Sequence, residues 1–240
     1  MTGAAALAAA RPQRVAWIDR ARGIALVAMI VFHFSYDLVL LDLVTWPVGT
    51  HWAWRGFAMA IAGSFIALSG VSLQLAAAGG LNGGAFLRRL ALLAGAAALV
   101  TLGTWAAMPY PVTFGILHAI AVFSILALPF LHAPAWGLVL AAAAVLVAPA
   151  LLTGPAFSHP LLYPLGLDPA PPPSFDYEPV FPWFAPMLLG LAAARFLPVP
   201  RGPVAGDLLA RMGRNSLVIY LLHQPLLLGI LIALARTGLV

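Results

Sequence analysis

The chain alternates long apolar runs with short polar interruptions, and this pattern predicts a bundle of membrane-spanning helices. A helical bilayer crossing needs about 20 mostly apolar residues, and about seven runs approach that length. Glycine and proline clusters such as "GGLNGG", "MPYP" and "HAP" separate the runs, as is typical of turns. The predicted spans are 17–43, 52–78, 86–107, 112–131, 134–152, 180–197 and 215–235.

The composition supports an all-α, polytopic membrane protein. Hydrophobic residues fill 63% of the 240 positions and charged residues only 8%, whereas soluble domains carry roughly 25% charged residues. We therefore expect residues 1–240 to form a single transmembrane domain. The tail "MTGAAALAAARPQR" places its arginines after the small apolar residues, the reverse of a signal peptide, so we expect it to be a short cytoplasmic tail.

The arginines gather at alternate ends of the predicted spans, which indicates orientation rather than nucleic-acid binding. They precede the first span, or lie between the second and third or the sixth and seventh: Arg11, Arg14, Arg20, Arg22, Arg88, Arg89, Arg195, Arg201, Arg211 and Arg214. The opposite ends carry Asp42, Asp168, Asp176 and Glu178. By the positive-inside rule the arginine ends are cytoplasmic. An odd number of spans then places the N-terminus inside and the C-terminus outside.

The segment 153–182 is dense in proline and longer than a connector requires. Proline removes a hydrogen-bond donor and fixes φ, so the segment should be extended or turn-like. Two interpretations stay open, a packed lid over an outward-facing site and a disordered link. Its aromatic residues favour a packed lid or an interfacial belt, and among them Trp183 is a candidate substrate contact.

Two ionisable side chains lie inside the first predicted span, in "IVFHFSYDLVLL". His33 and Asp37 are four residues apart and share a helix face, in the half of the span away from the arginines. Such groups cost several kcal/mol in a membrane unless they are paired or hydrated. A carboxylate can fix the tautomer of an imidazole and raise its basicity, so the two form a candidate acid–base dyad. The alternative is that both bind water near the outer headgroups.

The remaining histidines are weaker candidates. His51 and Arg55 lie one turn apart at the outer mouth of the second span, and His118 lies deeper, in the fourth. Arg55 and His118 are candidate substrate contacts, although His118 also fits a satisfied core residue. His223 lies beside a proline that frees a backbone carbonyl, so a structural role is expected there. The histidines lack tight ligand spacing and the chain has no cysteine, so no metal site is expected.

At the arginine ends, Asp19, Arg22, Arg88 and Arg89 can form an anion pocket. Guanidinium groups present fixed donors that suit phosphate. The alternative is that they are plain topology charges. That alternative fits Arg22 less well, because Gly23 follows at once and permits the close approach of another element.

Five blocks of the chain resemble the bacterial members of the heparan-α-glucosaminide N-acetyltransferase catalytic-domain family. In order they are "IDRARGIALVAMIVFHFSYDL", "FIALSGVSL", "FGILHAIAVF", "DYEPVFPWFAPMLLG" and "RNSLVIYLLHQPLL", from Asp19 to about Leu227. They are also similar to a wider transmembrane acyltransferase superfamily. Its O-acyltransferase branch shares an Asp-x-x-Arg-Gly opening, a histidine in the first span and a Ser-Gly motif in the second.

The resemblance implies that acyl-CoA, with acetyl-CoA as the expected donor, binds from the cytoplasmic side of a bacterial inner membrane. The acetyl group would pass to a sugar amine or hydroxyl of the cell envelope at the outer face. The family's catalytic histidine carries over to His51 in "THWAWRGF", and the histidine of the O-acyltransferase branch carries over to His33.

The resulting hypothesis is a membrane acyltransferase in which His33 or His51 acts as general base and Asp37 orients His33. Arg22, Arg88 and Arg89 would hold the coenzyme phosphates. One alternative is a proton-coupled transporter or flippase of a small envelope precursor, with buried ionisable groups as its relay; the lack of an internal repeat counts against it. Another is a non-catalytic scaffold, for which ionisable residues inside a span are needless. The acceptor, the acyl chain and a homodimeric state stay open.

Overall fold

The computed structural model describes residues 15–198 and 207–237, and within these ranges the secondary structure is helical with no β-strand. Among the described residues, five helices are long and apolar enough to cross a membrane: α1 (Ala16–Leu40), α2 (Trp52–Ala77), α3 (Gly83–Ala107), α5 (Ala135–Leu152) and α8 (Ser216–Thr237). Two shorter apolar helices, α4 (Ile116–Leu126) and α6 (Val180–Ala193), occupy the fourth and sixth predicted spans. A short helix, α7 (Leu208–Arg214), precedes α8. Arg11, Arg14 and Arg201 lie outside the described residues.

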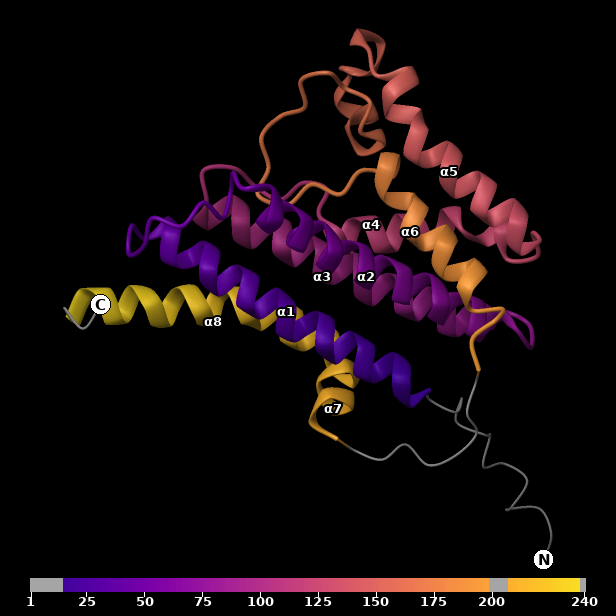
Figure 1. Cartoon of the computed structure of the whole chain (residues 1–240), viewed down its shortest axis with the longest axis horizontal. Coiled ribbons are helices and arrows are strands. Elements are labelled where there is room, and N and C mark those ends of the chain that lie inside the picture. The colour runs from indigo at the N-terminus through magenta and orange to yellow at the C-terminus, as the bar shows by residue number, and fades with distance from the viewer. Residues whose placement is uncertain (1–14, 199–206, 238–240) are drawn as a thin grey trace, which may run out of the picture.

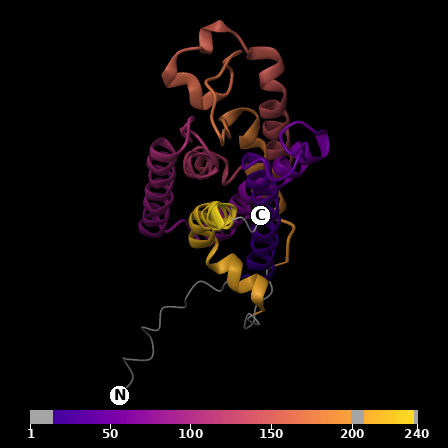
Figure 2. The same ribbon diagram turned by 90° about the vertical axis from the view of Figure 1, so that its left-hand side faces the viewer.

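The first three helices run back and forth along the long axis of the molecule, so the start of α1, the end of α2 and the start of α3 lie at one end (Figure 1). We call this the arginine end, because the described arginines of the predicted cytoplasmic set lie there: Arg20, Arg22, Arg88, Arg89, Arg195, Arg211 and Arg214. Seen along that axis, α8 lies between α3 on one side and α1 with α2 on the other (Figure 2).

Helix α4 is short because the chain before it turns back into the bundle as non-helical backbone. The Thr101 hydroxyl of α3 donates to the carbonyl of Val112 at 2.6 Å, and the Thr104 hydroxyl accepts from the Val112 amide at 2.9 Å. Backbone at membrane depth is tolerated only where such partners and surrounding protein satisfy it. The two threonines thus hold the segment 108–115 beside α3, well inside the end of that helix.

The proline-rich linker between α5 and α6 is packed against the bundle. The Tyr163 and Tyr177 rings stack at 4.4 Å between centroids, and the Tyr177 hydroxyl donates to the Tyr163 carbonyl at 2.7 Å. Farther along, the Glu178 amide donates to the Phe114 carbonyl at 3.0 Å. A packed segment, rather than a disordered link, therefore describes this part of the chain.

Glycines permit close contact between α2 and α6. A Cβ atom at Gly190 would lie 3.0 Å from the carbonyl carbon of Ala67, and one at Gly70 would lie 3.1 Å from the sulfur of Met187. Small residues of this kind let membrane helices approach closely. In the stretch "LSGVS" of α2, Gly70 is therefore the residue that allows α6 to approach.

A second glycine contact joins α1 to α7. A Cβ atom at Gly23 would lie 2.8 Å from the carbonyl carbon of Leu209, so the prediction that Gly23 admits another element is confirmed. On the other helix, a Cβ atom at Gly213 would lie 2.6 Å from the carbonyl carbon of Asp19. The short helix is thereby held against the first turns of α1.

Candidate functional site

A cavity of about 630 Å³ lies between α1, α2, α3, α4 and the start of α8. Its charged and hydroxyl-bearing lining residues are Asp19, Arg22, Ser69, Ser72, Arg89, Arg214, Ser216 and Tyr220. Apolar side chains line much of the rest, including Ile116, Leu117 and Ile120 of α4. The arginines belong to the arginine end, and Ile116 is the first residue of α4. Such a cavity suits a ligand with an anionic head and a slender, less polar arm.

The guanidinium groups are fixed by two serines on one face of α2. Arg22 donates from Nη2 to the Ser72 hydroxyl at 2.5 Å, and Arg89 donates from Nη2 to the Ser69 hydroxyl at 2.7 Å. Ser69 and Ser72 are three residues apart, so a helix presents both to the same side. The Ser72 hydroxyl donates its own hydrogen to the Leu68 carbonyl, which leaves its lone pairs to accept from Arg22.

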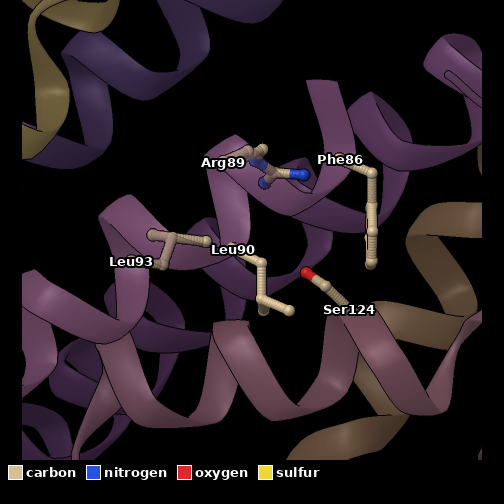
Figure 3. Close-up of a pocket in the computed structure, with 5 residues that line it drawn as sticks. All are labelled: Phe86, Arg89, Leu90, Leu93 and Ser124. Carbon is tan, nitrogen blue, oxygen red and sulfur yellow. The ribbon is translucent and has the colours of Figure 1, made fainter. Parts of the chain in front are cut away.

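The carboxylate of Asp19 completes this group. It is 4% exposed, and its Oδ1 accepts from Nη1 of Arg22 at 3.5 Å. Three of the four predicted anion-pocket residues, Asp19, Arg22 and Arg89, therefore line one cavity. The fourth, Arg88, is exposed and is not among the lining residues. Figure 3 shows the neighbouring Arg89 in a narrow crevice with Phe86, Leu90, Leu93 and Ser124.

One wall of the cavity is supplied by the α7–α8 region, through Gly213 and Arg214. Helix α7 is attached to α1 by an ion pair between Arg20 and Asp207. Asp207 is also the N-cap of α7 and accepts from the Ala210 amide at 2.7 Å. That backbone hydrogen bond, and then the one from Arg20, lower the pKa of the Asp207 carboxyl.

The predicted pairing of Asp37 with His33 is not formed in the described part of the chain. Oδ1 of Asp37 instead accepts from Nε2 of Gln224 at 2.6 Å, and the His33 ring contacts the His223 ring at 4.9 Å between centroids. The reason is that α8 packs against this face of α1, so its polar side chains engage both groups. Asp37 is fully buried there.

His223 contacts the backbone of its own helix, but not at the carbonyl that the proline frees. Pro225 frees the carbonyl of Leu221, four residues back, whereas Nδ1 of His223 lies 2.6 Å from the carbonyl oxygen of Tyr220. The ring is 9% exposed, and its Nε2 is buried without a hydrogen-bond partner among the described residues.

The other predicted site residues lie away from the cavity lining. His51 is exposed and caps the N-terminus of α2, where its Nδ1 accepts from the amide two residues on at 3.2 Å. Arg55 is exposed one turn later. His118 lies 3.2 Å from the hydroxyl of Thr101 through its Nε2, and Trp183 packs against the main hydrophobic core.

Two acidic residues that the sequence assigned to the outer side, Asp176 and Glu178, pack against the bundle, where Asp176 is half-buried and Glu178 is buried. Oδ2 of Asp176 accepts from the Ile116 amide at 2.9 Å and so caps α4. Gly115 makes room for it, since a Cβ atom there would lie 2.8 Å from Cγ of Asp176. Glu178 is 9% exposed, with Oε2 buried and unpaired. The spacing in "DYEP" is a sequence signal that could have shown this. Residues two apart in an extended chain point the same way, so Asp176 and Glu178 can both face the bundle.

Asp176 lies next to the cavity wall, since Ile116 both lines the cavity and donates its amide hydrogen to Asp176. Within the described residues, no group of three or more histidine, aspartate or glutamate side chains is placed to hold a metal ion.

The family model described as heparan-alpha-glucosaminide N-acetyltransferase, catalytic, matches residues 14–225. The match spans the cavity, the α1–α8 contact and His223. No curated protein and no solved structure matches the chain. With five helices in its described part able to cross a bilayer, the chain is a multi-pass membrane protein that belongs to the heparan-alpha-glucosaminide N-acetyltransferase catalytic family.

Proposed function

We propose that the protein is an acyl-CoA-dependent acetyltransferase. It takes acetyl-CoA from the arginine end and passes the acetyl group to an amine or hydroxyl of a sugar at the opposite end. The observation that carries this proposal is the cavity, whose lining combines three guanidinium groups with apolar side chains. Coenzyme A has matching parts, with phosphates at one end and a thin arm that ends in the thioester.

Arg22, Arg89 and Arg214 would bind the phosphates, because guanidinium donors match phosphate oxygens in geometry and charge. The arm would follow the cavity toward Ile116 and Tyr220. The apolar wall there excludes water from the thioester, which prevents its hydrolysis and strengthens polar interactions around it.

The acceptor would meet the thioester near the α1–α8 contact, and His33 would act as general base. His33 is favoured over His51 because Nδ1 of His51 is engaged in capping α2 at an exposed position. General-base help is typically worth ~10²–10⁴-fold in rate. As the acceptor attacks, a C–N or C–O bond forms and the C–S bond breaks. The thiolate then takes the proton from His33, and coenzyme A leaves as the thiol.

The orientation follows from the positive-inside rule, which places the arginine end in the cytoplasm of a bacterial inner membrane. In this proposal all seven apolar helices cross the bilayer, with the N-terminus inside and the C-terminus outside. The non-helical segments next to α4 and α6 complete those two crossings. The acceptor is then a glycan of the cell envelope, reached from outside.

The test is titration of acetyl-CoA into the purified protein in lipid nanodiscs, with Arg89→Ala and Arg88→Ala as a matched pair. Arg89 lines the cavity and its neighbour does not. A charge-assisted hydrogen bond is worth about 1.5–3 kcal/mol, so Arg89→Ala should weaken binding roughly 10- to 100-fold, while Arg88→Ala binds like the parent. A parent protein that binds no acetyl-CoA at millimolar concentration, or equal losses in both variants, would contradict the proposal.

A further inference from the structure

The hydrogen bond of His223 fixes which ring nitrogen carries its hydrogen. Nδ1 lies 2.6 Å from the Tyr220 carbonyl oxygen. A carbonyl can only accept, so Nδ1 must be the donor. In the neutral ring, Nε2 then carries a lone pair and no hydrogen. The backbone of α8 therefore sets the tautomer of this histidine.

The lone pair of Nε2 is inside the protein. This atom is buried and has no hydrogen-bond partner among the described residues. Buried polar atoms are normally hydrogen-bonded, so a buried lone pair in this position is suited to accept a hydrogen bond from a protonated group. His51 has the opposite arrangement, because its Nδ1 accepts from a backbone amide and its hydrogen must lie on Nε2.

His223 contacts both a residue that lines the cavity and the predicted base. Tyr220, which lines the cavity, lies one turn earlier on α8, with 5.6 Å between its ring centroid and that of His223. The His33 ring of α1 packs edge-on against the His223 ring, with an interplanar angle of 63°. The other titratable groups near this contact are Asp37 of α1, which is bonded to Gln224, and the linker acids near Tyr220.

We propose, on the basis of the acetyl-transfer function above, that His223 is a positioning residue that shares the proton taken up by His33. His33 removes the proton from the acceptor amine or hydroxyl as the new bond to the acetyl carbon forms. The C–S bond breaks, and its electron pair stays on sulfur. Nε2 of His223 shares the proton of the His33 imidazolium until that proton passes to the thiolate, which leaves as the thiol of coenzyme A.

Two substitutions separate this role from a structural one. His223→Asn keeps an N–H donor near the position of Nδ1, so it can still bond the Tyr220 carbonyl, but it has no Nε2. His223→Ala loses both. We expect both variants to bind acetyl-CoA like the parent and to lose ~10²–10⁴-fold in kcat, with a flattened rate profile between about pH 5 and 8. A parent-like rate and pH profile for His223→Asn would overturn the proposal, because a structural role is rescued by the retained donor.

A measurement independent of activity tests the same geometry. Nitrogen-15 NMR of histidine-labelled protein, with the His223 signals assigned by their loss in His223→Asn, should show the neutral tautomer with hydrogen on Nδ1. Hydrogen on Nε2 would overturn the proposal. If the parent protein neither binds acetyl-CoA nor transfers acetyl groups, the proposed function falls and the shared proton with it. If the parent is active and His223→Asn matches it, only the role of His223 falls.

Discussion

Substitution of Gly213 by alanine tests whether the α1–α7 contact shapes the cavity. The added Cβ would lie 2.6 Å from the carbonyl carbon of Asp19, whereas carbon atoms pack best at about 3.5–4.0 Å. The carbonyl oxygen of Asp19 lies closer still, so the two helices must separate by more than about 1 Å. Overpacking of this size costs about 1–3 kcal/mol, and alanine returns up to about 1 kcal/mol through its helix propensity.

The matched control is Gly229→Ala in α8, where a Cβ atom would meet nothing within 4 Å. This variant gains the helix propensity without the clash and should be as stable as the parent or slightly more stable. We expect Gly213→Ala to unfold at lower temperature in detergent, and to bind acetyl-CoA more weakly because Gly213 and Arg214 line the cavity. Equal stability and equal affinity for the two variants would refute the reasoning.

Three further predictions concern hydrogen bonds at other points of the bundle. A double-mutant cycle of Asp37→Ala and Gln224→Ala should give a coupling of about 1 kcal/mol in bicelle unfolding; additive effects would contradict the 2.6 Å hydrogen bond between them. The pKa of Asp207 is depressed below its usual 3.8, so this carboxylate stabilises α7 docking above that pH and loses the effect as pH falls through its folded-state pKa. The rate of hydrogen exchange in α7 should thus rise in acid. Asp207→Asn keeps an N-cap side chain but removes the negative charge that pairs with Arg20, so it should abolish this pH dependence. Thr101→Val should lower stability by about 1–2 kcal/mol, because it strands a buried carbonyl; a neutral effect in thermal denaturation would count against the described packing.

The positions of the helices could be predicted because hydrophobic length is a local property. The first span was expected at 17–43, and α1 covers Ala16–Leu40. The anion pocket was predicted with Arg88 and Arg89 together. Successive helical residues point about 100° apart, so only one of two adjacent arginines can face the cavity, and periodicity alone does not say which.

The pairing of side chains between helices could not be predicted in this way. His33 and Asp37 lie four residues apart on one helix face, and the sequence alone predicted that they pair with each other. The contact of α8 with that face gives each a different partner, His223 or Gln224. The burial of Glu178 could not be predicted for a related reason, since a link between spans is expected to be exposed to solvent, whereas this one packs against the bundle.

The non-helical backbone beside α4 constrains how the chain can be inserted during synthesis. Helix α4 has 11 residues, which span about 16 Å, or half of a bilayer core. The Phe114 carbonyl and Ile116 amide find their partners in Glu178 and Asp176, which the ribosome adds only after α5 is complete. Polar backbone groups without partners are costly in apolar surroundings. The start of α4 is therefore fully hydrogen-bonded only after the linker has been made, so this part of the bundle closes late in translation rather than one helix at a time.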